Sequence, residues 1–533
     1  MKVNLEFLTQ EDLRQIKKLG IPGKQIYHQL QAFERGTRFC NLIRPASIND
    51  GIKRVSKTER DLFITQYESG HRHIKQVKFI PASGAATRMF EIPLYFLNHP
   101  GDTEDWLKTD KLNSPSVELN FMKDFIQGFE KNEFAFCSDL ATVMKKGNQH
   151  VPKIKDHRDL NTVLNYLLTP KGLNYANLPK ALIKFHAYGN HSRTPLEEHL
   201  VEASQYIKDG RGLTRLHFTV SAEHRKRVEQ YLNSALPGFK SESRGFRISY
   251  STQSPHTNTI AVDEDNQPFR DHQGQLVFRP GGHGALIENL NKLTADLIFI
   301  TNIDNVVPDH LKDNVILYKK ILAGYLSVVQ GKTFNYLKQF KSEKCNRRLL
   351  DQAIQFCQDH LNIHFPEIFG SWSHEKKITV VFNKLNRPIR ICGMVENTGE
   401  PGGGPFWTSD HQDQISLQII EKAQVNPKSK RQQSILSSST HFNPVDIVCG
   451  IKNFKGEKFN LSEFIDPDSY FIAEKTIAGK PLKALELPGL WNGAMANWIT
   501  LFVEVPITTF NPVKIVNDLL RTPHQGIMRS HNQ

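Results

Sequence analysis

The sequence predicts an α/β fold built on an open, mixed and mainly parallel sheet that helices flank. Two observations predict it: short apolar runs recur from Val77 onward, and segments with helical periodicity alternate with them. The runs expected to form strands are "VKFIP", "RLHFTVS", "FRISYS", "DLIFITNI", "ITVVFN" and "IRICGMV". A length of 533 residues also allows two to four structural units.

Helix signals follow several of these runs. Ser221 ends the run "RLHFTVS" and is placed to cap a helix in which apolar residues keep helical spacing. Thr194, Pro195 and Glu197 fit a capping box with proline at the first helical position. After "FRPGGHG", the segment "ALIENLNKL" places its leucines on one helical face.

The pattern divides the chain into four regions. Residues 1–75 are charged and amphipathic, which predicts an N-terminal helical region. Residues 76–525 hold the expected α/β core, interrupted by a polar, helix-leaning insertion at 100–170. Residues 526–533 form a short tail.

The composition is that of an ordinary globular protein, with 39% hydrophobic and 23% charged residues. Apolar stretches are too short to span a bilayer, and the first 20 residues lack the apolar core of a signal peptide. We therefore expect a cytoplasmic protein without a membrane partner. The six cysteines form no C-x-x-C pair, which argues against disulfides and a thiolate zinc site and favours a hard, oxygen-bound metal.

The net charge of +13 suits either nucleic acid or phosphorylated small molecules. Lysines and arginines are dispersed, and no RNA-binding signature or helix-turn-helix spacing is present. Nucleic acid is therefore the less favoured partner.

A strand-loop segment at residues 78–96 is the first candidate site. Its turn, Ser83-Gly84-Ala85-Ala86, precedes Thr87 and Arg88. Backbone N–H groups in such a turn attract anions, and an arginine can clamp phosphate oxygens. The alternative is a plain turn between a strand and a helix.

A glycine-rich segment is the second candidate. Gly281, Gly282 and Gly284 surround His283 immediately before a predicted helix. Three glycines in four residues indicate unusual backbone angles or the close approach of something to the chain. We expect that something to be a ligand, although a structural turn also uses glycine.

Polar residues end the run "DLIFITNI". Asp304 and Asn305 are expected at the carboxyl edge of the sheet, where ligands bind in open α/β folds. One aspartate suffices to hold Mg²⁺ when phosphates and waters complete its shell.

Two candidate cations follow prolines: Lys180 in "NLPKAL" and Lys514 in "FNPVK". The alternative for each lysine is an ordinary surface charge.

In this order, the motifs resemble those of UDP-sugar pyrophosphorylases, a type of nucleotidyltransferase. The matching segments are Ala86-Thr87-Arg88-Met89, Pro179-Lys180, Pro280-Gly281-Gly282-His283-Gly284, Ile303-Asp304-Asn305 and "FNPVKIVNDLL", with Gln253 similar to a glutamine that reads uracil. The pattern is also similar to that of an uncharacterised bacterial family known only as a domain of unknown function.

The resemblance implies a nucleotide-diphospho-sugar transferase-like fold. It implies that a nucleoside triphosphate, UTP above all, reacts with a sugar 1-phosphate to give a nucleotide-sugar and pyrophosphate. Arg88, Lys180 and Lys514 would be catalytic, and Asp304 would hold Mg²⁺. The implied nucleotide-binding residues are Ser83, Gly84, Ala85, Thr87, Gln253, Gly281, Gly282, His283, Gly284 and Asn305. Two alternatives stay open: a non-catalytic nucleotide or nucleotide-sugar binder, and a metal-dependent glycosyltransferase.

Overall fold

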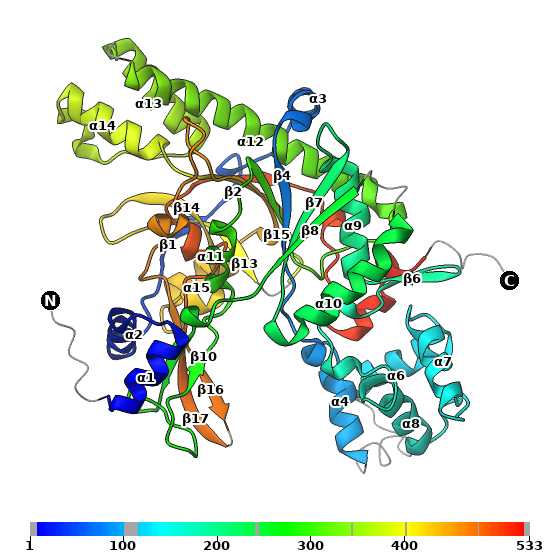
Figure 1. Cartoon of the computed structure of the whole chain (residues 1–533). Coiled ribbons are helices and arrows are strands. Elements are labelled where there is room, and N and C mark those ends of the chain that lie inside the picture. Colours follow the sequence, from blue (N-terminus) through cyan, green and yellow to red (C-terminus); the bar gives the residue numbers. More distant parts are fainter. Residues whose placement is uncertain are drawn as a thin grey trace. The chain divides into compact units, whose positions relative to one another are not determined.

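The chain folds into two compact units, each built from separate stretches of sequence (Figure 1). The computed structural model describes residues 8–100, 116–239, 245–342, 345–399, 402–477 and 479–526. Unit 1 comprises Met1–Val77, Ser251–Ile300 and Lys319–Ile507. Unit 2 comprises Lys78–Tyr250, Thr301–Tyr318 and Thr508–Gln533.

Unit 1 contains most of the strands. Its helices are α1 (Gln10–Leu19), α2 (Gly23–Arg35), α3 (Lys57–Gly70), α11 (Leu286–Asn291), the larger part of α12 (Lys312–Lys341), α13 (Arg347–Leu361), α14 (His374–Leu385) and α15 (Lys430–Ser437). Its strands are β1 (Asn41–Pro45), β2 (Ser47–Ile48), β3 (Gly51–Lys53), β9 (Thr259–Val262), β10 (Phe278–Arg279), β11 (Leu297–Ile300), β12 (Ile389–Glu396), β13 (Gly403–Ser409), β14 (Ile415–Glu421), β15 (His441–Gly450), β16 (Phe471–Ile477), β17 (Lys480–Glu486) and β18 (Ile499–Glu504).

Unit 2 is richer in helix. Its helices are α4 (Glu91–Asn98), α6 (Val117–Glu130), α7 (Cys137–Lys146), α8 (His157–Leu168), α9 (Pro195–Tyr206) and α10 (Ala222–Ala235). Its strands are β4 (Gln76–Pro81), β5 (His186–Tyr188), β6 (His191–Arg193), β7 (Leu213–Thr219) and β8 (Gly245–Ser251).

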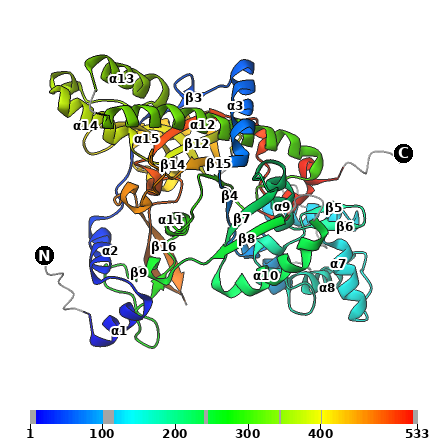
Figure 2. The same cartoon turned by 45° about the horizontal axis from the view of Figure 1, so that its top comes forward.

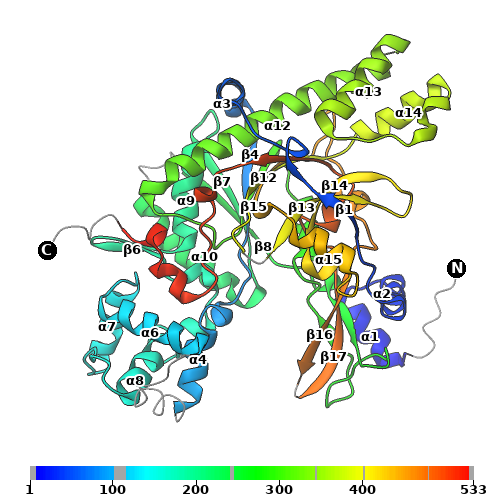
Figure 3. The ribbon, with the colours of Figure 1, turned by 180° about the vertical axis from the view of Figure 1, so that it is seen from behind.

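The predicted α/β class, with a mixed and mainly parallel sheet, is confirmed. In unit 1 the strands run in the order β2-β3-β18-β12-β15-β11. The neighbours β2, β3, β18 and β12 are parallel, whereas β15 is antiparallel to both β12 and β11. Central strands such as β12 are buried on both faces, as expected of a sheet that helices cover. Unit 1 also holds the sheets β1-β13-β14 and β10-β9-β17-β16; in Figure 3, α15 is seen beside β1.

In unit 2, β4 pairs in parallel with β7, and β8 follows β7 in the strand order. Helices α4, α6, α7 and α8 gather together in Figure 1. Their apolar side chains form one hydrophobic cluster that also takes in Met89, Val306, Val513 and Val516. Segments that the sequence separates by hundreds of residues are thus fixed in a common core.

Two expectations for local structure are wrong. The N-terminal region is not all helical, because β1, β2 and β3 occupy residues 41–53; there Leu42 is buried where β1 pairs with β13. The run "ITVVFN" is not a strand but lies in α14. Ser373 caps that helix by accepting from the backbone of Lys376, and buried Val381 and Leu385 keep the four-residue spacing of one helical face.

The helical insertion is described as α6, α7 and α8, whereas its residues 101–115 lie outside the described residues, as do 527–533 of the tail. The predicted capping box at Thr194 is confirmed, with Pro195 in the first turn. No described helix combines the length and apolarity needed to cross a membrane.

Close packing between α3 and α12 yields a stability prediction (Figure 2). A Cβ atom on Gly324 of α12 would overlap the carbonyl oxygen of Phe63 in α3. We expect Gly324→Ala to lower the free energy of unfolding by about 2 kcal/mol or more, because neither backbone can move freely. Urea denaturation measures the change.

Gly331 provides the matched control, since it lies in the same helix with open space around its Cβ position. Gly331→Ala is expected to be neutral or to stabilise by up to about 1 kcal/mol, as alanine is the better helix former. Equal effects of the two substitutions would contradict the packing argument.

Candidate functional site

The first loop, residues 82–88, connects β4 to the segment before α4. Ala86 within the loop and Met89 directly after it are buried in the hydrophobic cluster of unit 2. The exposed residues of the loop are Ser83, Gly84, Ala85, Thr87 and Arg88. Among the described residues, the Arg88 guanidinium makes no hydrogen bond or ion pair. The loop therefore presents its backbone and an unpaired cation to solvent.

Backbone pairing places Lys180 beside the first loop. The Lys180 N–H donates to the carbonyl oxygen of Gly84 at 3.1 Å, and the Ala86 N–H donates to that of Leu178 at 3.0 Å. Pro179 fixes the backbone before Lys180 in an extended conformation. Two predicted motifs that are far apart in sequence thus form one bonded unit.

Asp304 lies shortly after β11 and accepts hydrogen bonds from two lysines. Its Oδ2 accepts from Nζ of Lys180 at 2.9 Å and from Nζ of Lys514 at 3.2 Å. Lys180 also donates to the carbonyl oxygen of Val513 at 2.9 Å. The Lys180 side chain is 12% exposed, whereas that of Lys514 is 45% exposed. Lys514 is therefore the lysine that solvent and solutes reach. We call these three residues the lysine–aspartate cluster.

Asn305 connects this corner to the C-terminal segment. Its Oδ1 accepts from the backbone N–H of Asn511 at 2.9 Å. The Val513 N–H donates to the carbonyl oxygen of Asp304 at 3.1 Å. Asn305 thus has a positioning role in the structure, beside the nucleotide contact that the resemblance implies for it.

Asp518 orders the backbone around Lys514. Its Oδ2 accepts from the N–H groups of Lys514 at 2.6 Å and Ile515 at 2.9 Å. One residue further, the Val516 N–H donates to the carbonyl oxygen of Met89 at 3.0 Å. The C-terminal motif is thereby tied to the end of the first loop.

The lysine–aspartate cluster carries a surplus of positive charge. Burial acts to raise the pKa of the Asp304 carboxyl, but the charges of Lys180 and Lys514 and their hydrogen bonds outweigh it and lower that pKa. Asp304 is therefore ionised at neutral pH. Within the cluster, two ammonium groups contact the one carboxylate of Asp304, a balance that favours anionic ligands.

The lysine–aspartate cluster can supply part of the coordination shell of the expected Mg²⁺. Oδ1 of Asp304 accepts no hydrogen bond from any described residue, so one carboxylate oxygen is free to ligate. Within the described residues, no group of three His, Cys, Asp or Glu side chains forms a protein-only metal site. A single carboxylate is the usual protein share when phosphates supply the remaining ligands.

The predicted glycine-rich segment belongs to unit 1, and its glycines are explained by the chain's own packing. Gly282 has a φ of +73°, and a Cβ there would lie 2.6 Å from Oε2 of Glu486. A Cβ on Gly284 would overlap the carbonyl oxygen of Pro488. The close approach inferred from the sequence exists, and the approaching group is the segment after β17.

His283 is held between backbone and an indole ring. Its Nδ1 accepts from the Leu490 N–H at 3.1 Å, and its ring stacks on Trp491 at 4.3 Å. Burial lowers the pKa of His283, although the charges of Glu421 and Glu486 oppose that shift. This histidine is therefore neutral at pH 7 and contributes packing to the segment.

Gln253 also lies in unit 1, shortly after β8. Its Nε2 is buried and donates to no described atom. A buried amide donor without an acceptor is costly, and it is satisfied when a ligand supplies a carbonyl oxygen.

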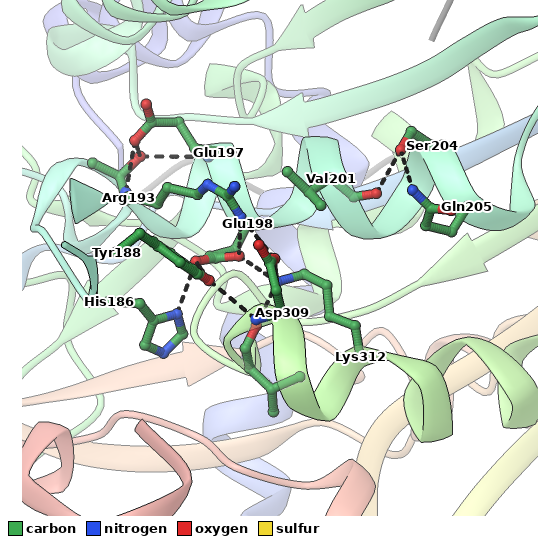
Figure 4. Close-up of polar contacts among 12 residues, drawn as sticks. His186, Tyr188, Arg193, Glu197, Glu198, Val201, Ser204, Gln205, Asp309 and Lys312 are labelled. Atoms are coloured by element: carbon green, nitrogen blue, oxygen red, sulfur yellow. Dashed lines mark hydrogen bonds and ion pairs between the residues drawn. The ribbon is translucent and has the colours of Figure 1, made fainter. Parts of the chain in front are cut away.

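A buried polar cluster around Glu198 was not predicted from the sequence (Figure 4). Glu198 on α9 accepts from Tyr188 Oη at 2.7 Å and from Lys312 Nζ at 2.5 Å, and His186 Nδ1 lies 2.9 Å from it. Lys312 also donates to Asp309 at 3.0 Å. These contacts join α9 to the chain that follows Asp304. The capping box predicted α9 itself, but nothing in the local pattern indicated which partners would surround its glutamate.

His524 extends this cluster to the C-terminal segment. Its Nδ1 lies 2.9 Å from Nε2 of His186, and the two rings stack at 5.3 Å. Burial, followed by the charges of His186 and Arg521, lowers the pKa of His524 to about 3. Burial acts to raise the pKa of Glu198, but hydrogen bonds and charges from His186 and Lys312 lower it to about 2.

Comparison with known families supplies the classification. The profile described as "Domain of unknown function (DUF4301)" matches residues 9–525. The chain belongs to the DUF4301 family. The sequence-based expectation of membership in a family of unknown function is thereby confirmed. Among curated proteins, none matches this DUF4301 chain.

Solved structures of UDP-sugar pyrophosphorylases are similar to this DUF4301 protein at low identity. The uridine diphosphate N-acetylglucosamine pyrophosphorylase of Trypanosoma brucei, in complex with inhibitor, is 11% identical with a TM-score of 0.46; the match covers 96% of this chain and 79% of that one. A mutant of the UDP-glucose pyrophosphorylase of Leishmania major, in complex with UDP-glucose, is 11% identical with a TM-score of 0.44, covering 98% and 82%.

The buried histidine yields a pH prediction. An unfolded chain protonates His524 near pH 6.5, whereas the folded protein resists protonation until about pH 3. The lowered pKa therefore contributes stability above pH 6.5 that is lost as the pH falls toward 3, at about 1.4 kcal/mol per pH unit for one proton. We expect His524→Asn to show a shallower loss of unfolding free energy between pH 6.5 and 5.

The matched control is His191→Asn, which changes an exposed imidazole of the same unit. Urea denaturation at several pH values measures both variants. An unchanged slope in His524→Asn, or an equal change in His191→Asn, would refute the assignment.

Proposed function

We propose that this DUF4301 protein is a nucleotidyltransferase that joins a nucleoside triphosphate, UTP in the first place, to a sugar 1-phosphate and releases pyrophosphate. The observation that carries the proposal is the lysine–aspartate cluster beside the first loop. Cations around one carboxylate suit a reaction whose two substrates are both polyanions. The resemblance of the motifs to those of UDP-sugar pyrophosphorylases supplies the reaction class.

The chemistry requires charge neutralisation rather than a general base. A phosphate oxygen of the sugar 1-phosphate attacks the α-phosphorus of the triphosphate. The bond from that phosphorus to the bridging oxygen breaks, and pyrophosphate leaves with the electron pair. Because a phosphate monoester has its second pKa near about 6, the nucleophile is already an anion at neutral pH. The absence of a serine or histidine nucleophile from the proposed set is consistent with this.

The proposed roles follow exposure and pairing. Arg88, exposed and unpaired, holds the leaving pyrophosphate, for which its planar guanidinium is well suited. Lys514, half exposed, neutralises the phosphates directly. Lys180, nearly buried, is anchored on Asp304 and the Val513 carbonyl and supplies a fixed positive charge beside the first loop.

Asp304 is the proposed metal ligand, with its free Oδ1. A bound Mg²⁺ would neutralise phosphate charge and orient phosphate oxygens.

Base recognition is proposed for Gln253 in unit 1. Its unsatisfied Nε2 donor matches a carbonyl oxygen such as those of uracil. The glycine-rich segment keeps its proposed role of contacting the nucleoside. The contacts would be made by backbone atoms, which tight packing fixes, of Gly281, Gly282, His283 and Gly284. Ser83, Gly84, Ala85 and Thr87 are proposed to contact the triphosphate through the exposed first loop.

A non-catalytic nucleotide-sugar binder is the second candidate. The observation that favours it is the first loop itself, where Ala85 and Ala86 stand in place of residues that reach left-handed backbone angles cheaply. Such a loop wraps a triphosphate less closely than a glycine-rich one. A metal-dependent glycosyltransferase is the third candidate, because it too would use an acidic metal ligand such as Asp304 at the end of a strand.

Pyrophosphate release tests the proposal directly. The full chain is assayed with Mg²⁺ across four nucleoside triphosphates and common sugar 1-phosphates, and release is expected with at least one pair. We expect Lys514→Ala to lower turnover by about 10²–10³, because a cation aimed at transition-state charge is removed. Lys226→Ala, which changes an exposed lysine on α10, is the matched control and is expected to leave turnover unchanged.

Two outcomes would contradict the transferase, and a third would contradict its assigned site. Stabilisation by a UDP-sugar without pyrophosphate release or exchange would favour the binder. Sugar transfer or hydrolysis from a nucleotide-sugar, without pyrophosphate chemistry, would favour the glycosyltransferase. Full activity in both Lys180→Ala and Lys514→Ala would show that the cluster is not the reaction site.

A further inference from the structure

A second basic site lies within unit 1, in a cavity of about 410 Å³. The end of α13, α14, the turn between β13 and β14, and the start of β18 line it. None of its lining residues belongs to the lysine–aspartate cluster or to the predicted nucleotide-binding set. We call it the basic cavity.

Two cations line the basic cavity without a carboxylate partner. Lys384 donates to Oε1 of Gln414 at 3.0 Å. Arg387 donates through Nε to the carbonyl oxygen of Asn383 at 3.2 Å, and its Nη1 lies 3.5 Å from that of Asn497. Both side chains are half-buried, and neither forms an ion pair with any described residue.

Burial and mutual repulsion act on these two groups. Burial lowers the pKa of Lys384, and the charge of Arg387 lowers it further. Burial also lowers the pKa of Arg387. His364 at the rim has its pKa lowered by burial and then by the charges of Arg44 and Lys384. The charged forms of these side chains are therefore disfavoured in the cavity, and a bound anion would stabilise them.

Asp410 compensates for this charge only in part: its charge favours the ionised form of Lys384, but burial and Arg387 outweigh it and the pKa of Lys384 stays lowered. Asp410 lines the same cavity, but its Oδ1 accepts from the backbone N–H groups of Gln412 at 2.8 Å and Gln414 at 2.9 Å. It is thus committed to closing the turn between β13 and β14, and it contacts neither cation within ion-pair distance.

An unsatisfied donor lies in the same wall. Trp498 lines the cavity and is 4% exposed, yet its buried Nε1–H finds no acceptor among the described residues. Protein structures leave few buried donors unpaired, and a bound ligand is one way to satisfy such a group. This observation is independent of the two cations and also indicates a missing acceptor.

We propose that the basic cavity binds a phosphate-bearing small molecule through Lys384 and Arg387. Arginine presents a planar fork that matches phosphate oxygens, and lysine adds a point charge. The cavity volume falls within the range of small-molecule sites and exceeds what a bare phosphate ion fills. Apolar side chains in the wall, among them Trp372 and Leu417, suit the organic part of such a ligand.

Helix capping is the competing explanation for the two cations. They lie at the C-terminal end of α14, where positive charge favours the helix dipole. Capping accounts for the Arg387 bond to the Asn383 carbonyl. It accounts neither for the unpaired Trp498 nor for a cavity between these cations and the start of β18.

Thermal unfolding of the full chain tests the proposal. Glucose 6-phosphate and sodium phosphate serve as probes, with sodium chloride at matched ionic strength. We expect the unfolding midpoint to rise with glucose 6-phosphate, to rise less with inorganic phosphate and to stay unchanged with chloride. An equal rise with both phosphates would mean that the site takes the free ion rather than an organic phosphate and would overturn the proposed ligand class.

Substitutions localise the effect. Lys384→Met and Arg387→Gln are each expected to weaken probe binding about tenfold or more, and Lys384→Arg to retain it. Lys384→Gln is a second variant that keeps a hydrogen-bonding side chain opposite Gln414. The matched control, Arg348→Gln, changes an exposed arginine of α13 and should bind as the unmodified protein does.

One further variant separates this site from the proposed transferase site. Lys514→Ala should keep the full response if the probe binds in the basic cavity. Loss of the response in Lys514→Ala, or its persistence in both Lys384→Met and Arg387→Gln, would overturn the proposal without bearing on pyrophosphate release.

Discussion

The carboxylate of Asp304 is the group on which the geometry of the candidate site depends. Its Oδ2 accepts from the nearly buried ammonium of Lys180 and from the more exposed ammonium of Lys514. Removing one member of such a buried pair leaves a charge without compensation, at a cost of about 3–5 kcal/mol. Backbone hydrogen bonds connect these residues to their neighbours: the Lys180 N–H donates to the Gly84 carbonyl oxygen, and the Val513 N–H donates to that of Asp304. The first loop and the C-terminal motif therefore owe their places to one acidic residue.

The sequence predicted the strands and motifs whose signal is local. Buried runs such as "IRICGMV" had the composition of a covered strand, and proline or an acidic residue marked the motifs around Lys180 and Asp304. The run "ITVVFN" was predicted to be a strand because β-branched residues favour strands, but it lies in α14, where Val381 and Leu385 are buried at helical spacing. Strands β1 and β3 are short, and they pair with β13 and β18, which lie far along the chain.

The features that could not be predicted from the sequence depend on contacts between residues far apart in the chain. No local signal singled out Glu198, because its partners His186 and Lys312 and the more distant His524 come from three other segments. The glycines at 281–284 indicated a close approach correctly, but no local pattern distinguishes a ligand from the chain's own backbone. The structure shows that Pro488 and Glu486 are the approaching groups.

The discontinuous build of unit 2 has a consequence for biosynthesis. Residues 508–526 are synthesised long after Lys78–Tyr250, yet they supply Val513 and Val516 to the hydrophobic cluster of unit 2 and place His524 beside His186. The earlier stretch therefore lacks part of its core until residues 508–526 have been synthesised. At about 5–20 residues per second, the nascent chain spends many seconds with apolar surface uncovered. Chaperone binding to the unfinished polypeptide would protect a core that a segment far along the chain completes.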